Sequence, residues 1–177
     1  MNTLVIVKPQ RDYIVGSMAV GLDKWRKAYQ EISRKMNFVD NIVIIKEENE
    51  EDSPACSEVK HCIKDTYGTD IYNELKEKLE TIIKKDKTKV YYIETEGSSD
   101  FESEDAFDIV TEINDERINS SNVIFFTGVF YEETCELAKR TAKTNSDKTI
   151  IVIKEGTVFE DVDYNLDLNY CDNIDEA

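Results

Sequence analysis

The stretch Leu4-Val5-Ile6-Val7 decides the fold, because it is the first of five short apolar runs that are rich in β-branched residues. The other four runs lie at residues 42–45, 90–93, 123–126 and 150–153, and helix-like segments separate them. A continuous apolar run of this length is typical of a strand that is buried on both faces of a sheet. The alternation of such strands with helices predicts an α/β protein.

Parallel strands joined by right-handed crossovers are the simplest arrangement of this pattern. We therefore expect a five-stranded, mostly parallel sheet with helices on both faces, a three-layer sandwich of the flavodoxin-like or Rossmann-like kind, and strand order 2-1-3-4-5. Residues 1–156 are predicted to form a single α/β domain. Residues 157–177 are predicted to form an acidic C-terminal tail, part of which docks on the domain through its apolar residues.

Helical periodicity predicts where the connecting helices lie. The first helix follows Ser17, its expected N-cap, and carries one apolar stripe made of Met18, Leu22, Trp25, Tyr29, Ile32 and Met36. Ser53-Pro54 predicts the start of a second helix, and a further stripe of Ile71, Leu75, Leu79, Ile82 and Ile83 predicts a third. Two more helices are expected, one carrying Phe107, Val110 and Ile113 and one over residues 131–143.

The charge of the chain limits its partners. With 38 acidic residues against 22 basic ones, the net charge is −16, and this repels nucleic acids and anionic membranes. No run is long enough to span a membrane, and no targeting segment is recognisable. We therefore predict a cytoplasmic protein with no direct nucleic-acid or membrane partner; the sequence makes no prediction of its oligomeric state.

The cysteine and histidine content predicts no metal site. Four cysteines lie at positions 56, 62, 135 and 171 without a C-x-x-C spacing, and His61 is the single histidine. We expect His61 to be a half-exposed structural residue. The chain has only six glycines and no G-x-G, so it lacks the usual phosphate cradle. The prediction is that it uses neither a metal nor a cofactor.

In a parallel α/β sheet, ligands bind beyond the carboxyl ends of the strands. The acidic segment 47–52, after the second run, is predicted to be a solvated turn. Polar residues after the other runs are the candidate ligand-binding residues: Lys8, Gln10, Tyr13, Glu94, Glu96, Thr127 and Gly128.

At the level of layout, the chain resembles the response-regulator receiver domain. Glu94, Thr127 and Lys154 match the acid, hydroxyl residue and lysine that end the third, fourth and fifth strands in that family. Lys8-Pro9 stands where the family has an acidic pair, and glutamate stands where it has its phosphorylated aspartate. The resemblance implies a receiver-like shape without phosphorylation.

A second resemblance covers residues 115–153. Asp115 precedes an apolar strand, and the next helix carries the sequence Glu133-Thr134-Cys135-Glu136-Leu137-Ala138. This pattern resembles the nucleoside 2-deoxyribosyltransferase-like superfamily. The chain departs from that family in three ways: Glu133 stands where the family has glycine, Asn122 stands where it has aspartate, and the chain has one more strand-helix unit than the family. The resemblance implies that Glu136 is a nucleophilic carboxylate and Asp115 a supporting acid. Alternatively, Glu136 forms a surface ion pair with Arg140 four residues later.

Two functions remain open from the sequence. The first is a protein that binds a small nucleoside-type or nucleotide-type ligand, with N-glycosidic hydrolysis or deoxyribosyl transfer as its reaction. The second is a non-catalytic acidic interaction protein that binds a basic protein surface, as a nucleic-acid mimic or inhibitor, through acidic rows at residues 94–116 and in the tail.

Overall fold

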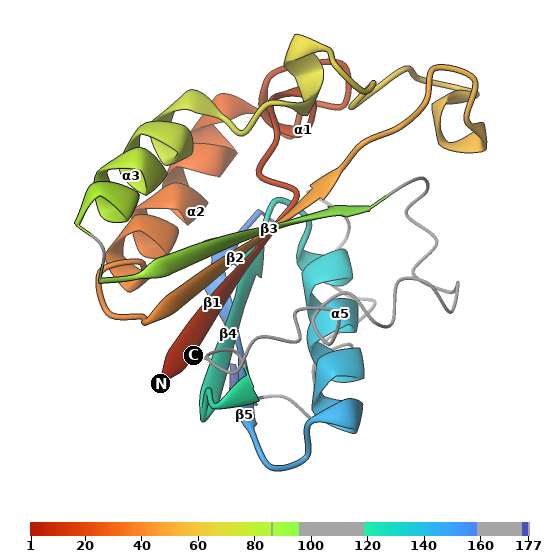
Figure 1. Ribbon diagram of the computed structural model, residues 1–177. Helices are drawn as coiled ribbons and strands as arrows, with labels where there is room; N and C mark the ends of the chain where they lie inside the picture. The colour runs from red at the N-terminus through yellow and green to blue at the C-terminus, as the bar shows by residue number, and fades with distance from the viewer. Residues whose placement is uncertain (86, 96–118, 159–174, 177) are drawn as a thin grey trace.

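The computed structural model describes residues 1–85, 87–95, 119–158 and 175–176 (Figure 1). Within these residues one parallel sheet forms in the order β3-β2-β1-β4-β5-β6. Its strands are β1 (Asn2–Val7), β2 (Asn41–Glu47), β3 (Lys89–Thr95), β4 (Val123–Gly128), β5 (Thr149–Thr157) and the two-residue β6 (Asp175–Glu176). All five apolar runs are strands, so the predicted α/β class is confirmed.

The predicted strand order 2-1-3-4-5 is wrong. β1 lies between β2 and β4, and β3 lies on the far side of β2, which is the Rossmann-like order. The chain therefore builds outward from β1 in one direction, and then returns to the other side of β1 to add β4 and β5. The lengths and spacings of the apolar runs do not predict this strand order, because every strand is apolar enough to occupy a central position in the sheet.

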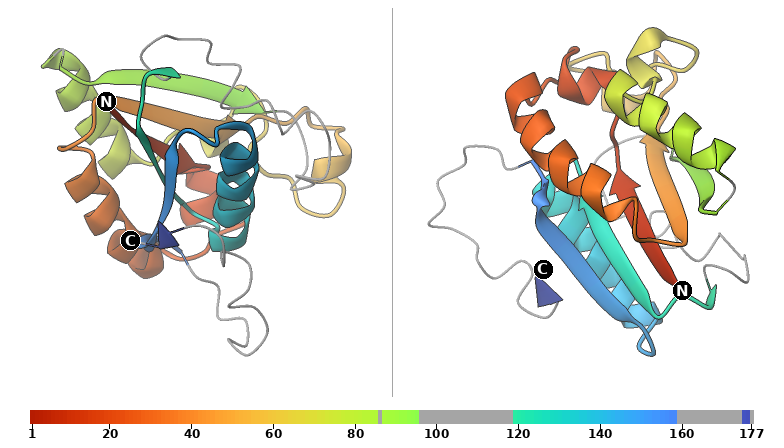
Figure 2. Two further views of the ribbon diagram at one scale, coloured as in Figure 1. Left: turned by 90° about the horizontal axis from the view of Figure 1, so that it is seen from below. Right: turned by 90° about the vertical axis from the view of Figure 1, so that its left-hand side faces the viewer.

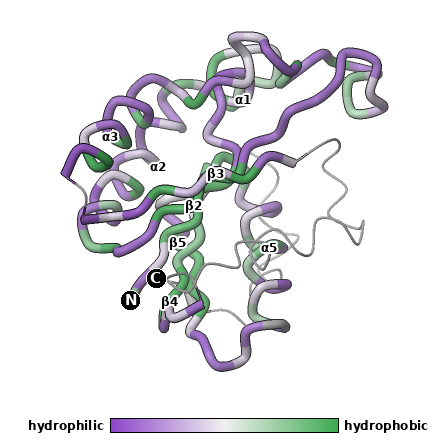
Figure 3. The backbone as a smooth tube through the Cα atoms, viewed as in Figure 1, coloured by the Kyte–Doolittle hydropathy of each residue, from purple (hydrophilic) through white to green (hydrophobic). Residues whose placement is uncertain are grey.

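The strands bury alternate residues on opposite faces. Leu4 pairs with Ile42 on one side and with Phe125 on the other. Leu4 and Ile6 pack against one set of helices, whereas Val5 and Val7 pack against the other. Because both faces are covered, the central strands are apolar at every position rather than at every second one. Figure 3 shows this apolar character along the middle of the sheet.

Helices cover both faces of the sheet (Figures 1 and 2). α2 (Leu22–Lys35) and α3 (Asn73–Lys84) lie on one face, where Trp25, Ile32, Leu75 and Leu79 are buried. α5 (Tyr131–Thr144) lies on the other face and buries Cys135, Leu137 and Ala138. The short α1 (Arg11–Ile14) follows β1 directly. None of the described helices is long and apolar enough to cross a membrane.

Several predicted helix boundaries need correction. α2 begins at Leu22 rather than after Ser17. Gly21 has a φ of +104°, which is outside the helical range, so the helix cannot begin before this residue and Gly21 is its N-cap. Met18 consequently lies outside the stripe and is exposed. Ser53-Pro54 starts only a single 3₁₀ turn (Pro54–Cys56), and a second 3₁₀ turn (Tyr67–Thr69) precedes α3. The expected helix around residues 107–113 lies outside the described residues.

Candidate functional site

The strand order creates a switch point between β1 and β4, the two strands whose connections leave in opposite directions. Such a point opens a crevice at the carboxyl ends of the two strands, where α/β proteins bind ligands. Lys8 follows β1 here, and Gly128 ends β4 three residues before α5 begins. A Cβ atom on Gly128 would lie 2.7 Å from the Val7 carbonyl oxygen, so only glycine permits this close approach of the two strand ends.

Lys8 turns its side chain into the protein. Its φ of 52° is in the left-handed region, which is uncommon for a residue with a side chain, and its amide donates to the Ile45 carbonyl oxygen at 2.8 Å. The side chain is only 5% exposed, and its ammonium lies 2.7 Å from Glu47 Oε2 and 3.0 Å from Glu133 Oε2. One buried cation thus joins a carboxylate at the end of β2 to one in the first turn of α5.

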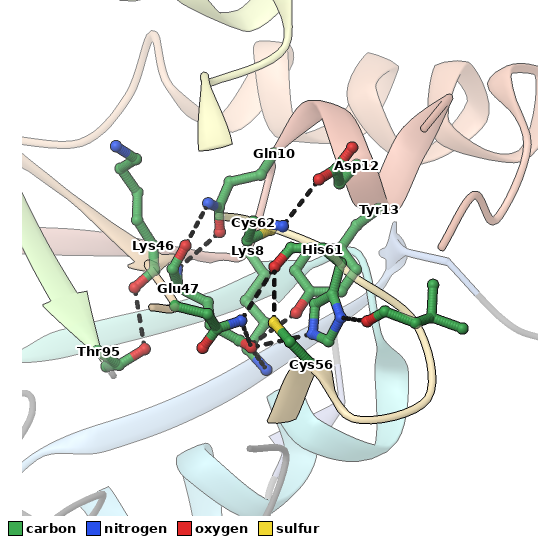
Figure 4. A network of polar contacts seen from close by, with 12 residues as sticks. Lys8, Gln10, Asp12, Tyr13, Lys46, Glu47, Cys56, His61, Cys62 and Thr95 are labelled. Atoms are coloured by element: carbon green, nitrogen blue, oxygen red, sulfur yellow. Dashed lines mark hydrogen bonds and ion pairs between the residues drawn. The ribbon is translucent and has the colours of Figure 1, made fainter. Parts of the chain in front are cut away.

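Glu47 is the best-connected carboxylate of the site (Figure 4). Its Oε2 accepts from the Tyr13 hydroxyl at 2.7 Å as well as from Lys8, and its Oε1 accepts from Asn49 Nδ2 at 2.8 Å. The His61 ring places Nε2 3.2 Å from the same Oε1. We call Lys8, Tyr13, Glu47, His61 and Glu133 the Lys8 cluster.

Gln10 fixes the backbone beneath this cluster. Its side-chain amide pairs with Glu47, since Oε1 accepts from the Glu47 N–H at 2.7 Å and Nε2 donates to the Glu47 carbonyl at 2.7 Å. Nε2 also donates to the Thr69 carbonyl oxygen at 3.1 Å. A buried glutamine therefore continues the hydrogen bonding of β2 where its neighbouring strand has ended, and holds Glu47 in place.

The loop that follows β2 closes over the cluster. The Asn49 amide donates to the Cys62 carbonyl oxygen at 2.8 Å, and the Cys62 amide donates to Asp12 Oδ2 at 2.7 Å. The Asp12 carboxylate fits against Gly68, where a Cβ atom would lie 2.0 Å from Oδ2. These bonds tie residues 49–62 to α1 and so position His61.

The two carboxylates of the cluster have opposite pKa shifts. Burial alone would raise the pKa of Glu47, but the charge of Lys8 and the hydrogen bonds from Lys8, Asn49 and Tyr13 outweigh it and lower the pKa. Burial raises the pKa of Glu133, and the attraction of Lys8 only partly offsets it. The surroundings of Glu47 therefore favour its ionised form, whereas burial favours the protonated form of Glu133.

The pKa values of Lys8 and Tyr13 respond to the same carboxylates. Burial alone would lower the pKa of Lys8, yet Glu133 and Glu47 together raise it, so Lys8 keeps its charge. Burial and the adjacent Glu47 carboxylate raise the pKa of Tyr13, so its hydroxyl stays a hydrogen-bond donor. The arrangement combines a buried positive charge with a carboxyl group whose protonated form burial favours, and two such groups can serve in acid–base catalysis on a polar bond.

Three residues predicted to bind a ligand meet at this site, namely Lys8, Gln10 and Tyr13. Thr127 is buried and donates from Oγ1 to the Val5 carbonyl oxygen at 3.1 Å, and Gly128 forms the close strand contact. Glu94 is exposed near the end of β3, with β2 and β1 between that strand and β4. This separation removes the receiver-like grouping of Glu94 with Thr127 and Lys154. Glu96 lies outside the described residues.

Glu136 lies on α5 and pairs with Arg140, with Oε1 and Nε 3.2 Å apart and the Glu136 side chain 34% exposed. This is the ion pair that the sequence offered as the alternative to a nucleophile. Asp115 lies outside the described residues.

Sequence reasoning missed Glu47, His61 and Glu133. Segment 47–52 was expected to be solvated, but Glu47 is 1% exposed because β2 continues two residues beyond its apolar run. His61 was expected to be half-exposed, but it is buried at 8%. In the β1–β2 register Val7 pairs with Ile45, so an extension of both strands places Glu47 level with Pro9, one residue beyond Lys8. Among the described residues, no group of three His, Cys, Asp or Glu side chains is arranged to hold a metal ion.

Comparison with known proteins adds a fold relationship. No family model and no curated protein matches the sequence. Solved structures do match, among them a pyrazinamidase/nicotinamidase from Streptococcus mutans UA159, with 17% identity, a TM-score of 0.66, and coverage of 89% of this chain and 87% of that one. The N-carbamoylsarcosine amidase of Thermoplasma acidophilum has 15% identity, a TM-score of 0.60, and coverage of 96% and 87%. The yeast nicotinamidase has 17% identity, a TM-score of 0.65, and coverage of 89% and 88%.

The likeness is one of fold. It overturns the sequence resemblance to the nucleoside 2-deoxyribosyltransferase-like superfamily, because the structures that match over most of the chain are nicotinamidases and an amidase. The short motif around Glu136 misled because a helix that packs on a sheet repeats small and apolar residues for packing alone. The role that the motif implied for Glu136 and Asp115 loses its basis.

Proposed function

We propose that this protein is a small-molecule hydrolase that cleaves an amide-type C–N bond at the Lys8 cluster. The observation that carries the proposal is the pair of carboxylates that share Lys8 at the switch point and have opposite pKa shifts. Two carboxyl groups whose environments separate their pKa values are typical of a site with one acid–base group and one permanent anion. The fold shared with proteins named nicotinamidase and N-carbamoylsarcosine amidase supports the choice of bond.

In this reaction Glu133 is the general base. Its carboxylate accepts a proton from a water molecule as the water oxygen bonds to the substrate carbonyl carbon, and the carbonyl π electrons move to the oxygen. The Lys8 ammonium stabilises that oxyanion. When the oxyanion re-forms the carbonyl, the C–N bond breaks and Glu133 returns the proton to the leaving nitrogen, so water and amide give carboxylic acid and amine.

The burial of the cluster agrees with these roles. The Glu133 side chain is 18% exposed, against 5% for Lys8 and 1% for Glu47, so Glu133 is the charged member of the three that solvent reaches most. Its buried Oε2 forms the ion pair with Lys8 without a well-directed hydrogen bond within the described residues. Glu47 does not react in this scheme; it holds Lys8.

Release of ammonia tests the proposal. The purified protein is incubated with nicotinamide, pyrazinamide, N-carbamoylsarcosine and simple aliphatic amides, and ammonia is measured. Glu133→Gln should lower the rate by about 10²- to 10⁴-fold, the usual contribution of a general base. Glu132→Gln is the matched control, since Glu132 is the exposed neighbour in the same helical turn. Equal rates for Glu133→Gln and wild type would refute the role of Glu133.

Incubation with a panel of nucleosides and nucleotides, with detection of free base, tests the other reaction that the sequence left open. Free base released from a nucleoside, with loss of that activity in Glu136→Gln, would favour N-glycosidic cleavage instead. If neither ammonia nor base appears, the acidic interaction protein remains as the proposal, supported by the net charge of −16. A salt-sensitive complex with a basic protein would then be the result to seek.

A further inference from the structure

His61 contacts a hydrogen-bond acceptor on each side of its ring. Nδ1 lies 2.7 Å from the Val59 carbonyl oxygen, and Nε2 lies 3.2 Å from Glu47 Oε1. A neutral imidazole has one N–H donor and one bare acceptor nitrogen. In either neutral tautomer, one ring nitrogen would therefore place its lone pair against an oxygen lone pair inside the protein.

Neither oxygen can remove this conflict by donating a proton. A backbone carbonyl has none, and Glu47 is held ionised by the Lys8 ammonium on Oε2 and by the donors Tyr13 and Asn49. Rotation of the ring by 180° places Cδ2 and Cε1 at the two acceptors and so loses both contacts. A proton on both nitrogens satisfies both contacts, which makes His61 an imidazolium.

Charged and polar groups from several elements of the fold surround His61. Glu47 on β2 is its charged partner, and the Tyr13 ring on α1 lies 5.6 Å from its own ring, centroid to centroid. Lys8 lies across the Glu47 carboxylate, and Glu133 lies beyond Lys8. Within its own loop, the Cys56 thiol donates to the His61 backbone carbonyl oxygen at 3.5 Å rather than to the ring. With His61 protonated, two cations and two anions balance in a buried space.

We propose that His61 is a positioning residue that works as a second cation for Glu47 and so releases part of the Lys8 charge to Glu133. The inference rests on the proposed function of the Lys8 cluster for its catalytic meaning, but the charge state of His61 is a property of the folded protein alone. With a neutral His61, Glu47 would hold Lys8 as its sole cation. The oxyanion that the proposed reaction forms would then be stabilised less.

The single histidine of the chain makes the charge state measurable without any substrate. We would label histidine with ¹⁵N in the wild-type protein and record both ring nitrogens at about pH 7.5, where a histidine of ordinary pKa, about 6.5, is mostly neutral. Both nitrogens should resonate as protonated N–H groups, and both should remain correlated to a ring proton. A spectrum with one bare nitrogen would overturn the proposal.

A double-mutant cycle tests the sharing of Glu47. Lys8→Met is introduced into wild type, into His61→Gln and into Lys60→Gln, and urea midpoints are compared. Glutamine keeps one donor toward Glu47 but no charge, so Lys8→Met should lower the midpoint more in the His61→Gln background than in wild type. Lys60→Gln removes an exposed charge from the same loop and should leave the Lys8→Met shift unchanged. Equal shifts in all three backgrounds would overturn the sharing.

The two proposals fail in different ways. Absence of ammonia release would refute the hydrolase and leave the nitrogen spectrum and the cycle as they are. A neutral His61, or an additive cycle, would refute the positioning role whether or not an amide is cleaved.

Discussion

Replacement of Lys8 by methionine is the sharpest perturbation of this protein, because it removes the cation between two buried carboxylates. The ammonium lies 2.7 Å from Glu47 and 3.0 Å from Glu133. At an effective dielectric constant of about 20, each contact is worth on the order of 6 kcal/mol of attraction. Desolvation of the ions costs several kcal/mol each and cancels much of this gain in the native protein.

In the variant, Glu47 stays buried and still bears the cost of desolvation, but it has lost the attraction of Lys8 that mainly offset this cost. Loss of one partner from a buried ion pair costs about 3–5 kcal/mol. We expect the lower end of that range, about 3 kcal/mol, because Tyr13 and Asn49 still donate to Glu47. Burial of the methionine side chain in the same space limits any loss of packing.

Urea unfolding followed by the fluorescence of Trp25, which is fully buried, measures this loss. Lys8→Met combined with Glu47→Gln should be more stable than Lys8→Met alone, because the second change removes the more deeply buried of the two carboxylate charges that Lys8 compensated. Lys60→Met, at an exposed ion pair, is the control and should unfold like wild type. A loss below about 1 kcal/mol for Lys8→Met, or a double variant less stable than the single one, would refute the reasoning about buried charge.

Three further predictions follow from the same geometry. Because the folded protein lowers the pKa of Glu47, the ionised carboxylate stabilises the protein at pH values above its pKa in the unfolded chain, about 4.3. This stability is lost as the pH falls through the pKa in the folded protein. The melting temperature of Glu47→Gln should therefore fall less steeply with acidification than that of wild type. The raised pKa of Glu133 has the opposite effect on stability, which is lost as the pH rises through the pKa in the folded protein. Glu133→Gln should therefore melt at a higher temperature than wild type near neutral pH, but not at about pH 4. Equal melting temperatures at pH 7 would contradict this. Gly128→Ala should cost about 1–3 kcal/mol in urea unfolding, because its Cβ would lie 2.7 Å from the Val7 carbonyl oxygen, whereas Gly21→Ala, with no atom within 4 Å, should lose only the cost of its positive φ.

How far the sequence reaches is clearest at the residues after each strand. Lys8, Gln10 and Tyr13 could be named as candidate site residues because they follow the first apolar run, and the carboxyl end of a parallel strand is where such folds bind ligands. Glu47 was hidden within a run of acids that resembles a solvated turn. Its burial depends on Gln10 and on the loop that carries His61, both of which reach it from elsewhere in the chain.

The sequence by itself determined the class of the fold, because apolar runs of strand length must be buried on both faces, and helices with one apolar stripe must cover them. Only the tertiary structure decided the order of the strands and, with it, the site. The order places β4 beside β1, and so brings Glu133 within 3.0 Å of Lys8 across 125 positions of sequence. Hydrophobic burial is not directional, so several strand orders would bury the same apolar residues. An ion pair between two buried charges forms only in a strand order that brings the two side chains together.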